Sequence, residues 1–161
     1  MAELTTTLGD QQMLVSTFYL GEAAFGLDTE QVQEVVRVGD ITPVHHAPRF
    51  VLGVMNLRGR ISTVIDLATK IELDRKETGS ESRIFIVDWQ GEQVGLLVDR
   101  VADAISIDRS DLKPSPENVR GIQGRHFKGV FQTEGRLVAL LDMMSVLAIE
   151  DGAEAASVRR E

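Results

Sequence analysis

The feature of this sequence that most constrains its fold is an internal repeat. Residues 53–71 align with residues 129–147 at a constant offset of 76, without a gap over 19 positions. Upstream, residues 26–38 align with residues 95–107 at an offset of 69, so the second copy carries seven extra residues between its two blocks. Because insertions of this kind belong in surface loops, the chain is predicted to contain the same supersecondary unit twice.

The most informative difference between the copies is a reversal of charge. Arg58 stands opposite Glu134 within an otherwise shared turn, and Glu34 stands opposite Asp103. A planar guanidinium suits a fixed ion pair or an interface anchor, and Glu34 is one candidate partner for Arg58. The identical positions of the longer block are Gly53/Gly129, Val54/Val130, Gly59/Gly135, Arg60/Arg136 and Asp66/Asp142.

Each copy is predicted to consist mainly of short β-strands. Residues 14–27 and 84–98 are rich in branched and aromatic side chains and contain turn chemistry at Gly21 and Gly91, which indicates one hairpin in each copy. Many short strands with regular turns, and no long helix alternating with strands, favour a mainly β fold of two small barrels over a parallel α/β sheet.

Three short helical segments are expected next to the strands. Residues 28–30, followed by Val32, Val35 and Val36 at helical spacing, predict a helical turn before an extended run to Val38. A further short helix is expected after each of the branched-rich strands 61–65 and 137–141.

Composition narrows the function classes. The chain has 161 residues, of which 43% are apolar and 26% charged, enough to bury a sizeable core. A net charge of −8 argues against a general nucleic-acid binder. The absence of cysteine excludes disulfides and favours a reducing compartment, which makes the cytoplasm the expected location. No run approaches 18 apolar residues, so no membrane insertion is expected.

Candidate catalytic and metal-binding residues are few. His45 and His46 are adjacent in a predicted extended loop and project to opposite sides, so with His126 they do not predict a metal site. Asp66 and Asp142 are compatible with the carboxylate pair of a hydrolase. Because each follows a strand at the same place in its copy, capping of the following helix is the better interpretation. We predict a protein that is not an enzyme and needs no cofactor.

Local charge offers a second functional hint. Residues 41–65 contain Arg49, Arg58 and Arg60 but no acidic residue, although the whole chain is acidic. Such a segment either steers an acidic protein partner or is a solvated loop, and the sequence leaves both interpretations open.

Several short motifs, occurring in order along residues 14–148, resemble the CheW family. The resemblance implies a pair of five-stranded, SH3-like β-barrels with a groove between them. The expected organisation is a flexible N-terminus over 1–13, a first barrel over roughly 14–75, a second barrel over roughly 82–148, possibly exchanging edge strands, and a tail over 149–161. The motifs are 32–35 (VQEV), 43–48 leading into 53–59 (GVMNLRG), 64–67 (VIDL), 94–101 (VGLLVDRV) and 113–116 (KPSP).

The resemblance also implies a function. It predicts a non-enzymatic adaptor that couples chemoreceptors, the methyl-accepting chemotaxis proteins, to the regulatory domain of a CheA-type histidine kinase. Such a protein would be cytoplasmic and would reach membrane receptor arrays only through its partners. The 161 residues leave no room for the receiver or ATPase segments that accompany this domain elsewhere. A CheW-like scaffold of a non-flagellar circuit, for pilus motility or surface sensing, remains the alternative.

Site residues carried over from the resemblance fall into two groups. The first group is expected to line a receptor-facing groove, and its valines are equally compatible with core packing. The second group is expected to bind the kinase. In this group, Asn118 stands where family members that assemble into rings with the kinase often have an aromatic residue. The receptor-facing groove is expected at Val32, Glu34, Val35, Arg58, Gly59, Val98 and Val101, and the kinase-binding residues at Gly53, Asn56, Lys113 and Asn118.

Overall fold

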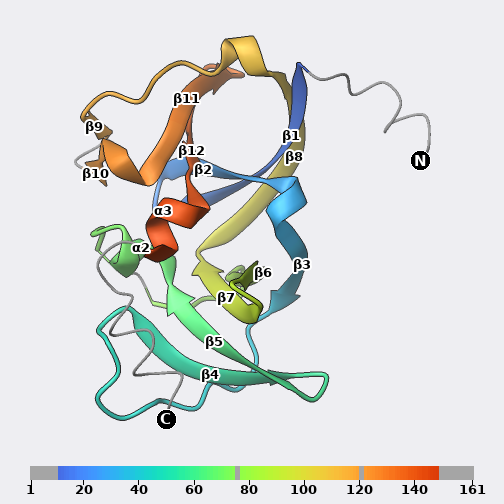
Figure 1. The fold of residues 1–161 in the computed structure, drawn as a ribbon, viewed down its shortest axis with the longest axis vertical. Helices are drawn as coiled ribbons and strands as arrows, with labels where there is room; N and C mark the ends of the chain where they lie inside the picture. The colour runs from blue at the N-terminus through green and yellow to red at the C-terminus, as the bar shows by residue number, and fades with distance from the viewer. Residues whose placement is uncertain (1–10, 75–76, 120–121, 149–161) are drawn as a thin grey trace.

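The computed structural model describes residues 11–74, 77–119 and 122–148, and its described part is dominated by two five-stranded sheets stacked along the long axis of the molecule (Figure 1). The mainly β prediction is therefore confirmed. Sheet A has the order β11-β12-β2-β1-β8 and sheet B the order β3-β6-β7-β5-β4. Sheet A consists of β1 (Gln12–Leu20), β2 (Ala23–Asp28), β8 (Arg100–Asp108), β11 (Phe127–Thr133) and β12 (Arg136–Leu141); sheet B consists of β3 (Val32–Arg37), β4 (Val51–Leu57), β5 (Arg60–Asp66), β6 (Arg83–Trp89) and β7 (Glu92–Val98).

The remaining elements are short. β9 and β10 form a two-stranded ribbon in the segment where the second copy carries its insertion. β1 begins at Gln12, and the tail 149–161 lies outside the described residues. These elements are η1 (Thr29–Gln31), α2 (Leu67–Lys70), η2 (Arg109–Asp111), β9 (Asn118–Val119), β10 (Ile122–Gln123), η3 (Gly124–His126) and α3 (Met143–Ala148).

The two sequence copies contribute strands to both sheets. The β1–β2 hairpin of the first copy lies between β12 and β8 of the second copy, with β2 parallel to β12. In the same way the β6–β7 hairpin of the second copy lies between β3 and β5 of the first copy, with β7 parallel to β5. Each sheet is therefore a hairpin from one copy inserted between three strands of the other.

A central apolar cluster joins the two sheets. Phe18 of β1 stacks on Phe25 of β2 with ring centroids 6.0 Å apart, and meets Phe85 of β6 edge-on at 5.3 Å. All three side chains are fully buried. A second cluster, around Val15, lies within sheet A and a third, around Ile84, within sheet B. The central cluster contains residues of both copies, so burying it requires both.

The predicted helical turn before residue 38 was wrong over most of its length. Only Thr29–Gln31 is helical, and Asp28 caps this turn by accepting a hydrogen bond from the Glu30 N–H at 3.0 Å. Val32–Arg37 is strand β3, in which Val35 pairs with Phe85. Branched side chains suit a pleated strand. The spacing of the valines fits either a helix or a strand, and pairing with β6 selects the strand.

Neither a spanning helix nor a metal cluster occurs in the described part of the chain. No helix there is long and apolar enough to cross a membrane. Within the same residues, no group of three or more His, Asp or Glu side chains is placed to hold a metal ion.

Candidate protein-interaction site

An arginine clamp fastens the β4–β5 turn to the edge strand β3. Arg58 donates two hydrogen bonds to the Glu34 carboxylate, Nη1 to Oε2 at 2.6 Å and Nη2 to Oε1 at 2.5 Å. The ion pair suggested by the sequence is confirmed. Its side chains are 67% and 31% exposed, respectively, so the clamp stands at the surface with its bidentate geometry open to a partner.

The β4–β5 turn presents Arg58 through an unusual backbone. Arg58 and Gly59 have φ values of 52° and 86°, the pattern of a two-residue hairpin turn that matches strand twist. The Asn56 side chain stabilises this turn by accepting a hydrogen bond from the Gly59 N–H at 2.8 Å. Glu134 and Gly135 adopt the same turn in the second copy, with φ values of 50° and 76°.

Two large apolar side chains are exposed on the strands next to the clamp residues in sequence. Val35, adjacent to Glu34 on β3, is 43% exposed, and Ile61, three residues after Arg58, is 62% exposed. Large apolar side chains exposed on a sheet are typical of a protein-interaction surface. Ile61 was not among the residues predicted from the sequence, although its place directly after the charged turn was a usable signal.

The valines predicted for the groove divide into surface and core. Val32 on β3 and Val101 on β8 are partly buried and pack against the central cluster at equivalent positions of the two copies. Val98, the last residue of β7, is only 1% exposed and belongs to that cluster. For Val98 the structure therefore favours the core-packing interpretation.

The residues predicted for kinase binding do not form one group. Gly53 is buried in β4, while the exposed Lys113 pairs through its backbone with Val130 of sheet A. Asn118 begins β9, and its side chain is outside the described part of the structure. Asn56 is on the same strand, β4, as Gly53, but it lies at the clamp turn whereas Gly53 lies near the start of the strand.

Asp66 and Asp142 each precede a short helix, α2 and α3. Asp142 caps α3 by accepting a hydrogen bond from the Ser145 N–H at 3.2 Å, as expected. Asp66 does not cap a backbone N–H of α2, which corrects the expectation for the first copy; its carboxylate accepts a hydrogen bond from the Thr69 hydroxyl at 2.5 Å. The hydroxyl of Thr69 reaches the carboxylate from within the helix and takes the place of a backbone donor.

Comparison with known proteins identifies the fold family. A family model described as a CheW-like domain matches residues 14–151. This chain belongs to the CheW-like family. The chemotaxis protein CheW of Thermotoga maritima is 35% identical over 143 residues, covering 88% of this chain and 93% of that protein, and the CheW of Rhizobium meliloti is 30% identical over 145 residues, covering 90% and 92%.

A solved structure supports the same assignment for the three-dimensional fold. The scaffolding protein TtCheW from Thermoanaerobacter tengcongensis superposes with a TM-score of 0.81 at 30% identity, covering 89% of this chain and 93% of that one. The two five-stranded sheets are thus the paired SH3-like barrels of a CheW-like protein. Protein FrzA of Myxococcus xanthus is also similar, at 29% identity over 123 residues.

In this CheW-like chain, acid is expected to weaken the clamp. The hydrogen bonds from Arg58 lower the pKa of Glu34, and the carboxylate in turn raises the pKa of Arg58. Because the pKa of Glu34 is lower in the folded than in the unfolded state, its stabilisation is complete above the ordinary glutamate pKa and is lost as pH falls through the lowered one. The difference in urea midpoint between the parent protein and Glu34→Gln should therefore be small at neutral pH and vanish in acid.

A second background controls this measurement. In the Arg58→Gln protein, Glu34→Gln should leave the same urea midpoint unchanged across that pH window, because the partner that lowers the pKa is gone. A midpoint difference in the parent protein that does not change with pH would contradict the assignment.

Proposed function

We propose that this chain is a non-enzymatic adaptor that couples chemoreceptors to a CheA-type histidine kinase in chemotaxis. The observation that carries the proposal is the exposed arginine clamp of sheet B, together with the exposed apolar side chains of Val35 on β3 and Ile61 on β5. A fixed guanidinium offers a partner a hydrogen-bonding group, and exposed apolar side chains on the same sheet offer area to bury. The sequence similarity to chemotaxis proteins supports the choice of partners.

The receptor-facing surface is proposed to lie along the edge strands. On β3 it comprises Val32, Glu34 and Val35, and on β8 it includes Val101. Edge strands present backbone groups as well as side chains, so an elongated helical segment could contact both strands. The turn residues Arg58 and Gly59 complete this surface at its sheet B end.

The kinase is proposed to bind at Asn56, which adjoins the receptor-facing surface through its hydrogen bond with Gly59, and at Lys113. Asn56 and Lys113 are both exposed, but they belong to sheet B and to the segment bridged to sheet A, respectively. Because the two candidate residues lie on different sheets, the kinase regulatory domain is proposed to contact both sheets. The chain is proposed to reach receptor arrays at the membrane through these contacts.

Reversing the charge of the clamp should weaken receptor binding. We expect Arg58→Glu to reduce the affinity for a receptor-tip coiled-coil fragment by at least about tenfold, because the guanidinium is lost and two carboxylates then face each other. Isothermal titration calorimetry at fixed salt measures this change. The matched control is Arg60→Glu, the same charge change at an exposed position two residues away, for which the expected change is less than about threefold.

A charge exchange distinguishes a lost ion pair from a damaged surface. The double variant Arg58→Glu/Glu34→Arg restores an ion pair in reversed orientation and should recover part of the affinity if the clamp positions the turn. Equal losses for Arg58→Glu and Arg60→Glu would reject the clamp as the binding determinant. Failure of the parent protein to bind any receptor-tip or kinase regulatory-domain fragment would reject the proposed function.

A further inference from the structure

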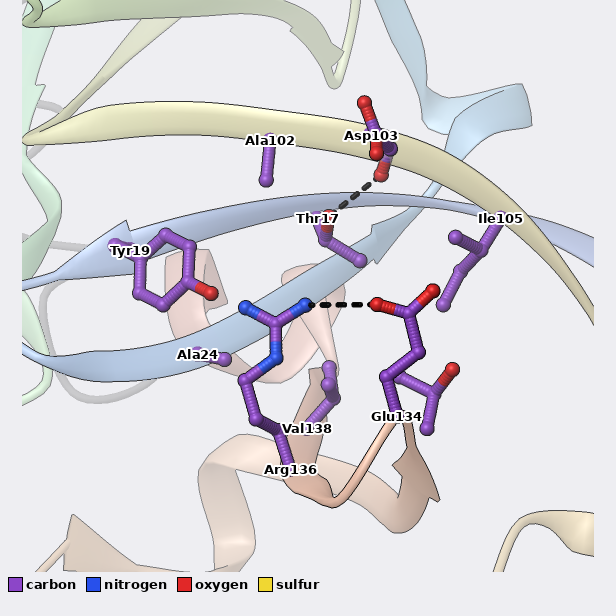
Figure 2. A pocket seen from close by; sticks show the side chains of 10 residues that line it. Thr17, Tyr19, Ala24, Ala102, Asp103, Ile105, Glu134, Arg136 and Val138 are labelled. Carbon is purple, nitrogen blue, oxygen red and sulfur yellow. Dashed lines mark hydrogen bonds and ion pairs between the residues drawn. The ribbon is translucent and has the colours of Figure 1, made fainter.

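The end of sheet A that corresponds to the clamp is hollow. A cavity of about 40 Å³ lies where the β11–β12 turn approaches β8 (Figure 2). Its floor is formed by inward-facing residues of the barrel, including Tyr19, Ala24 and Val138, which belong to the sheet A core cluster. One water needs roughly 10–15 Å³, so the cavity has room for a few waters or one planar side-chain head group.

The corresponding end of sheet B is filled by polar side chains. The Ser62 hydroxyl donates a hydrogen bond to Gln93 Oε1 at 2.6 Å, and Gln93 Nε2 donates to Gln33 Oε1 at 3.4 Å. The repeat places Val138, Ala24 and Ala102 opposite these three residues. Two small alanines and a valine can neither fill that volume nor make those hydrogen bonds, which explains why this end of sheet A remains open.

The rim of the cavity carries the charge reversal seen in the sequence. Asp103 and Glu134, which stand opposite Glu34 and Arg58, both line the cavity. Two carboxylates cannot form an ion pair with each other as Arg58 and Glu34 do. The Thr17 hydroxyl donates a hydrogen bond to the backbone carbonyl of Asp103 at 2.5 Å (Figure 2).

Arg136 offsets this charge only in part. Its Nη2 lies 3.9 Å from Glu134 Oε1, with side chains 49% and 82% exposed, and its guanidinium is 5.5 Å from the centre of the Tyr19 ring. A single long contact between exposed groups is a weak ion pair. Arg100 also lies 4.1 Å from the centre of the Tyr19 ring, but Glu81 pairs with it at 3.7 Å. The charged groups that line the cavity, Asp103, Glu134 and Arg136, therefore leave an excess of one negative charge at its rim.

We propose that this cavity binds an arginine side chain from a partner protein, which takes the place that Arg58 occupies in the first copy. The clamp shows that a guanidinium fits between these strands when a carboxylate stands on the edge strand. A planar fork can donate to Glu134 and Asp103 together, whereas an ammonium is a single point charge. The cavity volume excludes a ligand much larger than one head group.

This inference goes beyond the proposed adaptor function and does not depend on it. It concerns the opposite barrel from the clamp and specifies the chemistry of a contact residue rather than the identity of the partner. The clamp and the cavity would then be complementary features of the two copies, one presenting an arginine and the other accepting one.

The test uses N-acetyl-L-arginine amide as the probe and follows backbone amide shifts by NMR at low, fixed salt. We expect saturable shifts at Ala102, Asp103, Glu134 and Val138, with a dissociation constant on the order of 10 mM for so small a contact. N-acetyl-L-citrulline amide has nearly the same shape but no charge, and should cause no saturable shift at these amides.

Two variants decide whether the rim carboxylates hold the probe. Glu134→Gln and Asp103→Asn should each weaken binding by at least about fivefold, and thermal unfolding verifies that both remain folded, as expected for exposed rim residues. Glu134→Arg should fill the site from within and abolish the shifts. The proposal is overturned if the parent protein shows no saturable shift at these amides, if citrulline binds equally well, or if both neutral variants bind the arginine probe unchanged.

Discussion

Replacing Gly53 by alanine is expected to lower the free energy of unfolding by about 3 kcal/mol or more, a large share of the stability of a domain this size. A Cβ at this position would lie only 2.1 Å from the carbonyl oxygen of Thr42 and 2.7 Å from its carbonyl carbon. The obstructing atoms are backbone, so they cannot rotate away as the end of a side chain would. Gly53 also has a φ of +149°, which side chains rarely adopt.

The collision would break a specific bridge. Thr42 and Val54 exchange two backbone hydrogen bonds of 2.8 Å each, and this pair ties the connection before β4 to the edge of sheet B. Moving Thr42 away to admit a methyl group would cost both bonds, at about 1 kcal/mol each, in addition to the strain at residue 53. Urea unfolding followed by circular dichroism measures the loss.

Two other glycines separate the collision from the general effect of the substitution. At Gly59 an added Cβ meets nothing within 4 Å although φ is +86°, so Gly59→Ala should cost only the left-handed penalty of about 1–2 kcal/mol. At Gly79 the space is also open and no left-handed φ is imposed, so Gly79→Ala should change stability by less than about 1 kcal/mol. A Gly53→Ala protein as stable as Gly59→Ala would contradict this account.

Gly53 illustrates what the repeat predicted well. Its counterpart Gly129 sits at the same kind of register shift between paired strands, and a Cβ there would lie 2.5 Å from the Lys113 carbonyl oxygen. Identity of the two glycines therefore reflects one steric requirement imposed twice. The repeat likewise predicted the mainly β fold and the charge difference between Arg58 and Glu134. In two copies of one scaffold, residues stay identical where the backbone geometry restricts the residue type, and they differ where side chains face solvent.

Other features depended on contacts that no local pattern records. The spacing of Val32, Val35 and Val36 fits a helix as well as a bulged strand, and only pairing with β6 selects the strand. Val98 and Val35 look alike in the sequence, yet one is 1% and the other 43% exposed. Burial differs because β7 is the middle strand of sheet B and β3 is its edge. The cavity in sheet A could be found only after the aligned residues were placed in a barrel.

The exchange of hairpins has the largest expected consequence. Alignment of the copies is the same whether each hairpin pairs with its own copy or with the other, so the arrangement rests on long-range contacts alone. If the chain is divided in the connection between residues 74 and 82, the fragment 1–78 lacks β6 and β7, which separate β3 from β5 in sheet B. The fragment 79–161 lacks β1 and β2, which separate β12 from β8 in sheet A.

Neither fragment is therefore expected to fold alone. Each would expose its half of the central cluster, including Phe18 and Phe25 in one fragment and Phe85 in the other, and would lose two adjacent strands from the middle of a sheet. We expect each isolated fragment to give a poorly dispersed amide NMR spectrum and no cooperative urea transition. An equimolar mixture should recover the dispersed spectrum of the intact chain, because the pairings that join the copies, β1–β8, β2–β12, β3–β6 and β5–β7, can then form between fragments.

The competing possibility is that each copy folds by itself, with the β1–β2 hairpin taking the place of β6–β7 beside β3 and β5. The side chains argue against this, since Gln93 of β7 hydrogen-bonds Ser62 inside sheet B, whereas the hairpin of the first copy would bring Ala24 to that position and leave a fully buried hydroxyl without this acceptor. An unsatisfied buried polar group costs about 1–3 kcal/mol, and the rest of the central cluster would still face water. A cooperative unfolding transition in the isolated fragment 1–78, at a midpoint independent of protein concentration, would show that the copies are autonomous and that the exchange does not hold the fold together.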